Sequence, residues 1–244
     1  MTGQPTDFAD EEVVSTYGYV SGYRGPIGLS EQESRLRLVF GGLGFVNLDY
    51  RAKIEKGEVL LPEGAEGWFC VPNWSKHPYI FGQDYSSAVR NVLGALKKVR
   101  GGRFSNYHEG EIDEKHLRQR DRTKACVQML SDAQENPDIL IVPAQFGIRH
   151  RDKSCQRVRF ICRGTEWALD SFSIGCMILT HPNRLMYFQD LWIHCAGDDF
   201  LCDYEDKLER SPFFFFIDQM LKFAASRLND TYPNDGSASA FLPE

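Results

Sequence analysis

Residues 136–163, NPDILIVPAQFGIRHRDKSCQRVRFICR, carry the strongest strand signals and anchor the fold prediction. The Asn-Pro pair at the start of this stretch ends any preceding helix. The apolar run 139–142 that follows is typical of a central strand. In 157–163, apolar residues alternate with arginines, which predicts a half-buried strand with one cationic face.

Helical signals lie on both sides of these predicted strands. Asp84 can cap a helix whose apolar residues recur at helical spacing up to the glycine pair 101–102. Asp113 is expected to open a second long helix, running to about Glu135, with a heavily charged and solvated first half. Two later segments are ambiguous: 174–179 is a strand or a buried helix, and 212–228 is a β-hairpin or an aromatic helix.

Strands and helices are therefore mixed along the chain rather than strictly alternating. This order predicts an α+β fold, a single globular domain with a mixed sheet and two or three main helices. Residues 1–16 are expected to be a disordered lead-in, because they are polar and turn-rich, and residues 17–244 to form the domain. No repeat or long linker divides that range.

Composition narrows the class of protein and its location. No apolar run approaches the roughly 18–20 residues needed to cross a bilayer, so no membrane association is expected. The first twelve residues have no basic and apolar regions of a signal peptide. The seven cysteines form an odd set with no C-x-x-C pair, which favours reduced, buried thiols in a cytoplasmic protein.

Charge is unevenly distributed along the chain. The net charge of −6 combines +7 over residues 90–163 with −5 before and −8 after that range. A basic segment of this kind can bind a phosphate-bearing partner such as a nucleic acid or a nucleotide. Alternatively, the basic and acidic segments face one another within the fold.

A cationic loop and strand are the leading candidate for ligand binding. The predicted ligand-binding residues are a glutamine and four arginines: Gln145, Arg149, Arg151, Arg157 and Arg159. Guanidinium groups bind phosphate and carboxylate in a bidentate manner, and loops at strand ends often hold ligands. We therefore expect a phosphate-bearing ligand here, with a solvated basic hairpin as the alternative.

An enzyme is the second hypothesis. A hydrolase or transferase would bring His150 or His194 together with Asp198 or Asp199 for acid–base chemistry. Gly-Asp-Asp at 197–199 is also an ordinary turn composition. The spacing matches no metal motif, so neither a metal nor a cofactor is predicted. Catalysis by a Ser/His/Asp or Cys/His group stays open, because such residues need only meet in space.

A third hypothesis uses aromatic surface. Phe213 to Phe216 are consecutive, and in a strand they would point to both faces of the sheet. If these rings form an exposed patch, the chain is an interaction or assembly factor with a protein partner. The sequence sets no oligomeric state.

Several segments resemble a family of uncharacterised bacterial hypothetical proteins without an assigned activity. The segments are GAEGWF at 64–69, ILIVPAQFGIRHR at 139–151, LTHPNRL at 179–185, DLWIHCAGDD at 190–199 and GSASAFLP at 236–243. The similarity runs from about Tyr17 to the C-terminus, which implies one recurring domain. It also implies that the small residues at 236–243 pack into the fold.

Overall fold

The computed structural model describes residues 13–202 and 209–243, in which helices and strands are mixed along the chain. The helices are α1 (Leu29–Val39), α2 (Leu48–Glu55), α3 (Pro78–Phe81), α4 (Tyr85–Val99), α5 (Asp121–Ala133), α6 (Cys155–Ile161) and α7 (Ser171–Thr180), with 3₁₀ turns η2 (Trp74–Lys76) and η3 (Ile148–His150). The strands are β1 (Gly67–Pro72), β2 (Phe104–Asn106), β3 (Leu117–Gln119), β4 (Ile139–Gln145), β5 (Glu166–Ala168), β6 (Ile193–His194), β7 (Asp198–Phe200), β8 (Arg210–Ile217), β9 (Met220–Arg227) and β10 (Ser239–Phe241). The predicted α+β single-domain fold is confirmed. Of the predicted lead-in, residues 1–12 lie outside the described part.

The strands form two sheets. The first has the order β1-β4-β10-β5 with antiparallel neighbours, so the predicted central strand, β4, does lie inside a sheet. All seven residues of β4 are buried. The second sheet follows the order β2-β9-β8-β7-β3, with β6 also paired to β8, and it is mixed because β2 runs parallel to β9.

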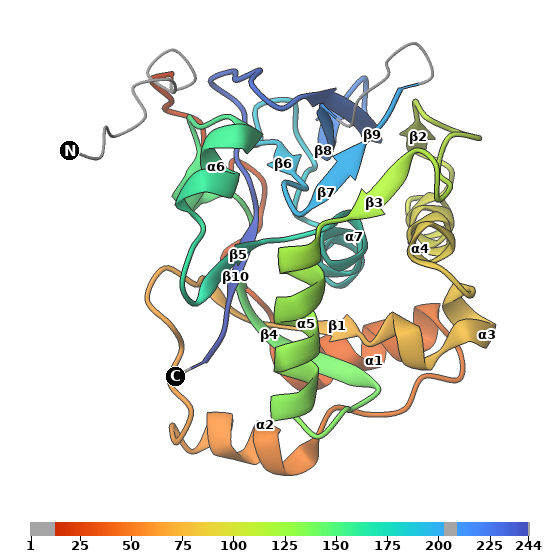
Figure 1. Cartoon of the computed structure of the whole chain (residues 1–244), viewed down its shortest axis with the longest axis vertical. Helices are drawn as coiled ribbons and strands as arrows, with labels where there is room; N and C mark the ends of the chain where they lie inside the picture. Colours follow the sequence, from red (N-terminus) through yellow and green to blue (C-terminus); the bar gives the residue numbers. More distant parts are fainter. Residues whose placement is uncertain (1–12, 203–208, 244) are drawn as a thin grey trace.

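Helix α7 fills the space between the two sheets (Figure 1). Every residue of α7 is buried, and Asp170 caps its start by accepting a hydrogen bond from Ser173 N at 2.7 Å. A Cβ on Gly175 would lie 2.4 Å from Val92 of α4 and 3.7 Å from Phe214 of β8. The ambiguous run at 174–179 is therefore a core helix. Among the described residues, no helix has the length and apolarity to span a membrane.

The amphipathic helix after Asp84 is confirmed as α4. The Asp84 carboxylate accepts a hydrogen bond from Ser87 N at 2.7 Å, and the apolar face of α4 packs on α7. The second predicted helix begins later than expected: α5 starts at Asp121 rather than Asp113. Residues 117–119 instead form β3, which pairs with β7, and this long-range pairing replaces the local helical hydrogen bonds.

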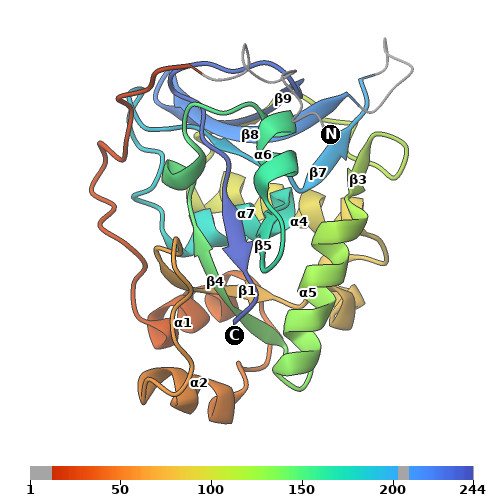
Figure 2. The same cartoon turned by 60° about the vertical axis from the view of Figure 1, so that its left-hand side comes forward.

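The predicted cationic strand over 157–163 is wrong, because this segment is helix α6 and its C-cap. The Ser154 hydroxyl caps α6 by accepting a hydrogen bond from Arg157 N at 3.0 Å. Cys155, Val158 and Cys162 are buried at helical spacing. Helix α6 contacts β5, and Gln156 N donates to Leu228 O just beyond β9, so α6 connects the two sheets (Figure 2).

The four consecutive phenylalanines belong to the hairpin β8–β9 rather than to an aromatic helix. Phe214 packs into the main core, while Phe213 and Phe215 stack on the opposite face beside Trp192. These three rings are buried and Phe216 is partly buried. The four rings therefore do not form one contiguous exposed patch.

Candidate active site

Cys155 is the first residue of α6. The Ser154 cap fixes the start of this helix, the Cys155 side chain packs with Val158 and Ala196, and the residue is only 2% exposed. Because Gln156 N donates to Leu228 O, the start of α6 is fixed against the end of β9, and the thiol has a set direction. That direction is toward β6.

His194 is held on β6 by backbone bonds on both sides. The strand pairs His194 with Phe213 of β8, and His194 N donates to Gly236 O at 2.8 Å. The imidazole of His194 stacks on the Phe213 ring, with 4.9 Å between the ring centroids and 14° between the ring planes. Backbone and ring contacts together leave the imidazole little rotational freedom.

Asp235 precedes the small C-terminal segment that continues into β10. Its backbone N donates to Tyr232 O at 2.9 Å, and its Oδ2 accepts a hydrogen bond from Tyr232 N at 2.9 Å, so a tight turn holds the carboxylate. The next residue, Gly236, lies against Gly147 and Leu191 so closely that a Cβ would approach both. The predicted packing of the residues from 236 onward into the fold is confirmed, since residues 236–241 are buried.

The side chains of Cys155, His194 and Asp235 form a linear arrangement, called the triad below. Cys155 Sγ lies 3.3 Å from His194 Nδ1, and His194 Nε2 lies 3.1 Å from Asp235 Oδ1. The thiol and the carboxylate therefore contact opposite nitrogens of one imidazole. The His194–Asp235 contact is an ion pair by distance, and neither Nε2 nor Oδ1 makes a hydrogen bond within the described residues. The order of thiol, imidazole and carboxylate is that of a nucleophile beside a base, with a third group next to the base.

The electrostatics favour a thiolate–imidazolium pair. Burial, the largest single effect, raises the pKa of the Cys155 thiol, but His194, Arg159 and Ser211 together lower it below its usual value. Burial would lower the pKa of His194, but Cys155 and Asp235 hold it well above its usual range. A cysteine with a lowered pKa beside a histidine has the character of a nucleophile rather than of an inert core thiol.

Arg159, one turn after Cys155, ties α6 to the β6–β7 connection. Its Nε donates to Ala196 O at 2.9 Å, its Nη2 donates to Asp198 O, and its Nη1 lies 2.9 Å from Asp199 Oδ1. Arg120 also pairs with Asp199 at 3.0 Å. Arg159 therefore positions the helix that carries the thiol.

The predicted pairing of His150 or His194 with Asp198 or Asp199 is not formed. Asp199 is neutralised by arginines, and Asp198 is fully buried, with Oδ1 accepting from the Tyr85 hydroxyl at 2.7 Å. His194 lies with Cys155 and Asp235, as described above. His150 lies 2.7 Å from Glu166 Oε1, at a separate location.

The predicted cationic site is also dispersed, because each of its polar groups has a partner within the protein. Gln145 is buried and donates to Ser237 O and Ser239 Oγ, both at 2.9 Å. The guanidinium groups have different partners, namely Glu166 for Arg149, Tyr17 O for Arg151, the Phe160 ring for Arg157 and Asp199 for Arg159. The arginines therefore stabilise the fold at separate places.

Sequence reasoning missed two members of the triad. Cys155 was expected to be only a buried reduced thiol, and Asp235, which directly precedes the small-residue segment at 236–243, was not singled out. A local signal for Cys155 did exist: the Ser154 cap followed by apolar residues at 155, 158 and 162 is a short helix pattern. Asp235 had no such signal, because its role depends on residues about 40 and 80 positions away.

No protein-family model, curated protein or solved structure matches this chain. The resemblance to the bacterial family therefore stays a prediction.

Proposed function

We propose that this chain is a cysteine-dependent hydrolase or acyl transferase. Cys155 is the nucleophile, His194 is the general base and acid, and Asp235 orients the imidazole. One observation carries the proposal: the thiol and the carboxylate lie 3.3 Å and 3.1 Å from opposite nitrogens of His194.

The chemistry follows from these positions. The Cys155 thiolate attacks the acyl carbon of an ester, thioester or amide, and a carbon–sulfur bond forms. The leaving group takes a proton from His194 as its bond to the acyl carbon breaks. Water, or an acceptor amine or alcohol, then gives a proton to His194 and attacks the thioester, which releases the acyl product and restores the thiolate.

The site is closed in this structure. Cys155 and His194 are 2% and 3% exposed, so a substrate reaches the thiol only when part of the surrounding shell moves. Val13 N donates to Asp152 O and the Ser15 hydroxyl donates to Pro233 O, so residues 13–15 lie against the two segments that flank Cys155 and Asp235.

Other functions have less support. Binding of a phosphate-bearing ligand, whether nucleic acid or nucleotide, would require arginines that instead contact groups within the protein. Recruitment of a protein partner by Phe213 to Phe216 would require rings that are mostly buried.

We further propose that the protein works in a reducing compartment such as the bacterial cytoplasm. All seven cysteines are free and buried, and the reaction requires Cys155 as a thiolate.

The test is acyl-enzyme formation by the full chain. The purified protein is mixed with small acyl thioesters, p-nitrophenyl esters and anilides, and its intact mass and tryptic peptides are measured by mass spectrometry. We expect one acyl group on Cys155 and a burst of about one equivalent of leaving group per chain.

Cys155→Ala is expected to abolish both signals. Cys126→Ala is the matched control, because Cys126 is also a buried cysteine, but burial raises its pKa and the charged group beside it is Arg122 rather than a histidine. A burst that persists in Cys155→Ala, or no adduct on Cys155 with any of the three acyl classes, would contradict the proposal.

A further inference from the structure

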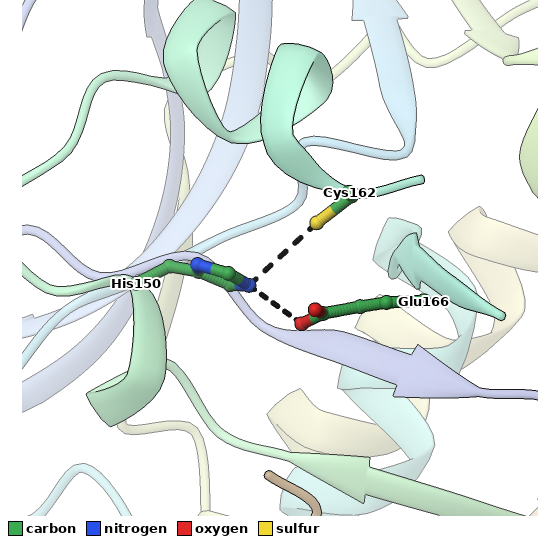
Figure 3. A group of neighbouring side chains, drawn as sticks. All are labelled: His150, Cys162 and Glu166. Carbon is green, nitrogen blue, oxygen red and sulfur yellow. Dashed lines mark hydrogen bonds and ion pairs between the residues drawn. The ribbon is translucent and has the colours of Figure 1, made fainter. Parts of the chain in front are cut away.

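A second cluster of reactive side chains lies apart from the triad. It consists of His150 on η3, Cys162 at the C-cap of α6 and Glu166 at the start of β5. His150 Nε2 lies 2.7 Å from Glu166 Oε1 and 3.6 Å from Cys162 Sγ (Figure 3). One nitrogen, one sulfur and one oxygen thus come together, all within 4.8 Å of one another.

This cluster differs from the triad in which imidazole nitrogen is used. In the triad, the thiol and the carboxylate contact opposite nitrogens of His194, which suits a base that exchanges a proton on one side and faces a carboxylate on the other. Here both groups approach the same nitrogen, Nε2 of His150, as Figure 3 shows. The three donor atoms therefore point toward one common space, which is how ligands are arranged around a metal ion.

We propose that His150, Cys162 and Glu166 form a site for a divalent metal ion of the zinc class, with solvent as the fourth ligand. Zinc accepts this mixture of nitrogen, thiolate sulfur and carboxylate oxygen, whereas magnesium and calcium prefer oxygen alone. Three protein ligands with one open position is the arrangement of a reactive zinc site.

Two of the three separations between donor atoms fit this ion, and the third is at most 4.8 Å. With zinc bonds of about 2.0–2.3 Å in a tetrahedron, neighbouring donor atoms lie about 3.3–3.7 Å apart. The separation of 3.6 Å between Cys162 Sγ and His150 Nε2 already has this value. The separation of 2.7 Å between Nε2 and Glu166 Oε1 is that of a direct hydrogen bond, and it would lengthen by less than about 1 Å when an ion enters.

The surroundings support the same site. His150 and Cys162 are 4% and 2% exposed, so the ion would be largely shielded from water. The Ser239 hydroxyl donates to Glu166 Oε1 at 2.7 Å and orients the carboxylate, as second-layer groups do in metal sites. Glu166 also lines a cleft of about 570 Å³ together with Arg149 and Arg163, which gives an entry path.

Arg149 competes for the same carboxylate. Its Nε lies 3.1 Å from Glu166 Oε1, and its side chain is 42% exposed. The guanidinium can therefore turn into the cleft when an ion binds. Removing this cation should tighten metal binding, a change that a purely structural role for the cluster would not produce.

The test uses Co²⁺ as a spectroscopic probe of the full chain after treatment with EDTA. We expect a single Co²⁺ per chain to give a near-ultraviolet thiolate-to-cobalt absorption band, and Zn²⁺ to displace it. Cys162→Ser and His150→Gln should abolish the band. Cys155→Ser, which changes the other α6 cysteine beside a histidine, should keep it.

Several outcomes would overturn the site: no band in the folded wild type, a band that survives Cys162→Ser, or a band that is lost in Cys155→Ser. Far-ultraviolet circular dichroism verifies folding of each variant. If Cys162→Ser does not fold, Arg149→Met leaves all three ligands in place and should bind Co²⁺ roughly two- to fivefold more tightly, the worth of a partly exposed ion pair. Unchanged or weaker affinity in Arg149→Met would equally reject the site. The triad shares no residue with this cluster, so either proposal can fail alone.

Discussion

Gly236→Ala is the change that most directly probes how the triad is held together. Gly236 follows Asp235 and accepts the hydrogen bond from His194 N, so it joins two members of the triad. A Cβ at this position would lie 2.7 Å from Gly147 O and 2.6 Å from Leu191 Cδ2. Leu191 can rotate, but the Gly147 carbonyl is backbone, so the segment that carries Asp235 must shift.

The magnitude follows from that contact. Overpacking a buried site costs about 1–3 kcal/mol. For a domain of this size, about 1 kcal/mol corresponds to roughly 2–4 °C in Tm, so we expect a fall of roughly 2–12 °C. Gly94→Ala is the matched control, because a Cβ there meets no atom within 4 Å and Gly94 is exposed inside α4. It should raise stability by about 0.5–1 kcal/mol.

The assay combines thermal denaturation with the rate at which iodoacetamide alkylates Cys155, measured by mass spectrometry. In Gly236→Ala, the displaced Asp235 should orient His194 less well, so the alkylation rate at neutral pH, relative to its own plateau at high pH, should fall under native conditions. Gly94→Ala should leave the alkylation rate unchanged. If Gly236→Ala is as stable as the wild type and Cys155 reacts at the same rate, the close packing at Gly147 does not hold the triad as we describe.

Two further predictions concern ionisation. The pKa of Cys155 is lowered, whereas the pKa of Cys162 is raised by burial and by Glu166, so alkylation of Cys155 should reach its half-maximal rate at a lower pH. His194→Ala should move the pH profile of Cys155 alkylation to higher pH. An unmoved profile would contradict the pairing of Cys155 with His194. Burial and the neighbouring Asp170 hold the pKa of Asp198 in the folded protein well above its usual range. Asp198 therefore contributes a free energy of folding that is fully present below its pKa in the unfolded chain, about 4, and is lost as the pH rises through its raised pKa in the folded protein. Asp198→Asn removes this pH-dependent loss, so in urea denaturation the variant should be more stable than the wild type at about pH 7 but not at about pH 4. An equal change in the free energy of unfolding at both pH values would show that the charge of Asp198 is not the cause.

The parts of the fold that were predicted correctly have local causes. Asp84 caps α4 through an amide three residues away, and the apolar spacing of α4 repeats every turn. The run at 139–142 is uniformly apolar because β4 is covered on both faces. In each case the deciding interactions, or their signature in the sequence, lie within one short segment.

The predicted strand at 157–163 shows where such local patterns mislead. Apolar residues at 158, 160 and 162 satisfy the period of a strand, yet 155, 158 and 162 also satisfy the period of a helix. The Ser154 cap and the packing of Cys155 against β6 favour the helix. Phe160 then lies partly exposed between Arg157 and Arg163, which contact its ring.

The sequence by itself determined the fold class, the core strand β4, the amphipathic helix α4 and the reduced state expected of the cysteines, because these depend on composition and short-range pattern. Only the tertiary structure decided which of the seven cysteines is activated. Residues 155, 194 and 235 lie on a helix, a short strand and a turn, and their side chains meet only because β6, α6 and the segment after Asp235 pack together. A pKa depends on the groups within a few ångströms of an atom, and no spacing along the chain reports those groups.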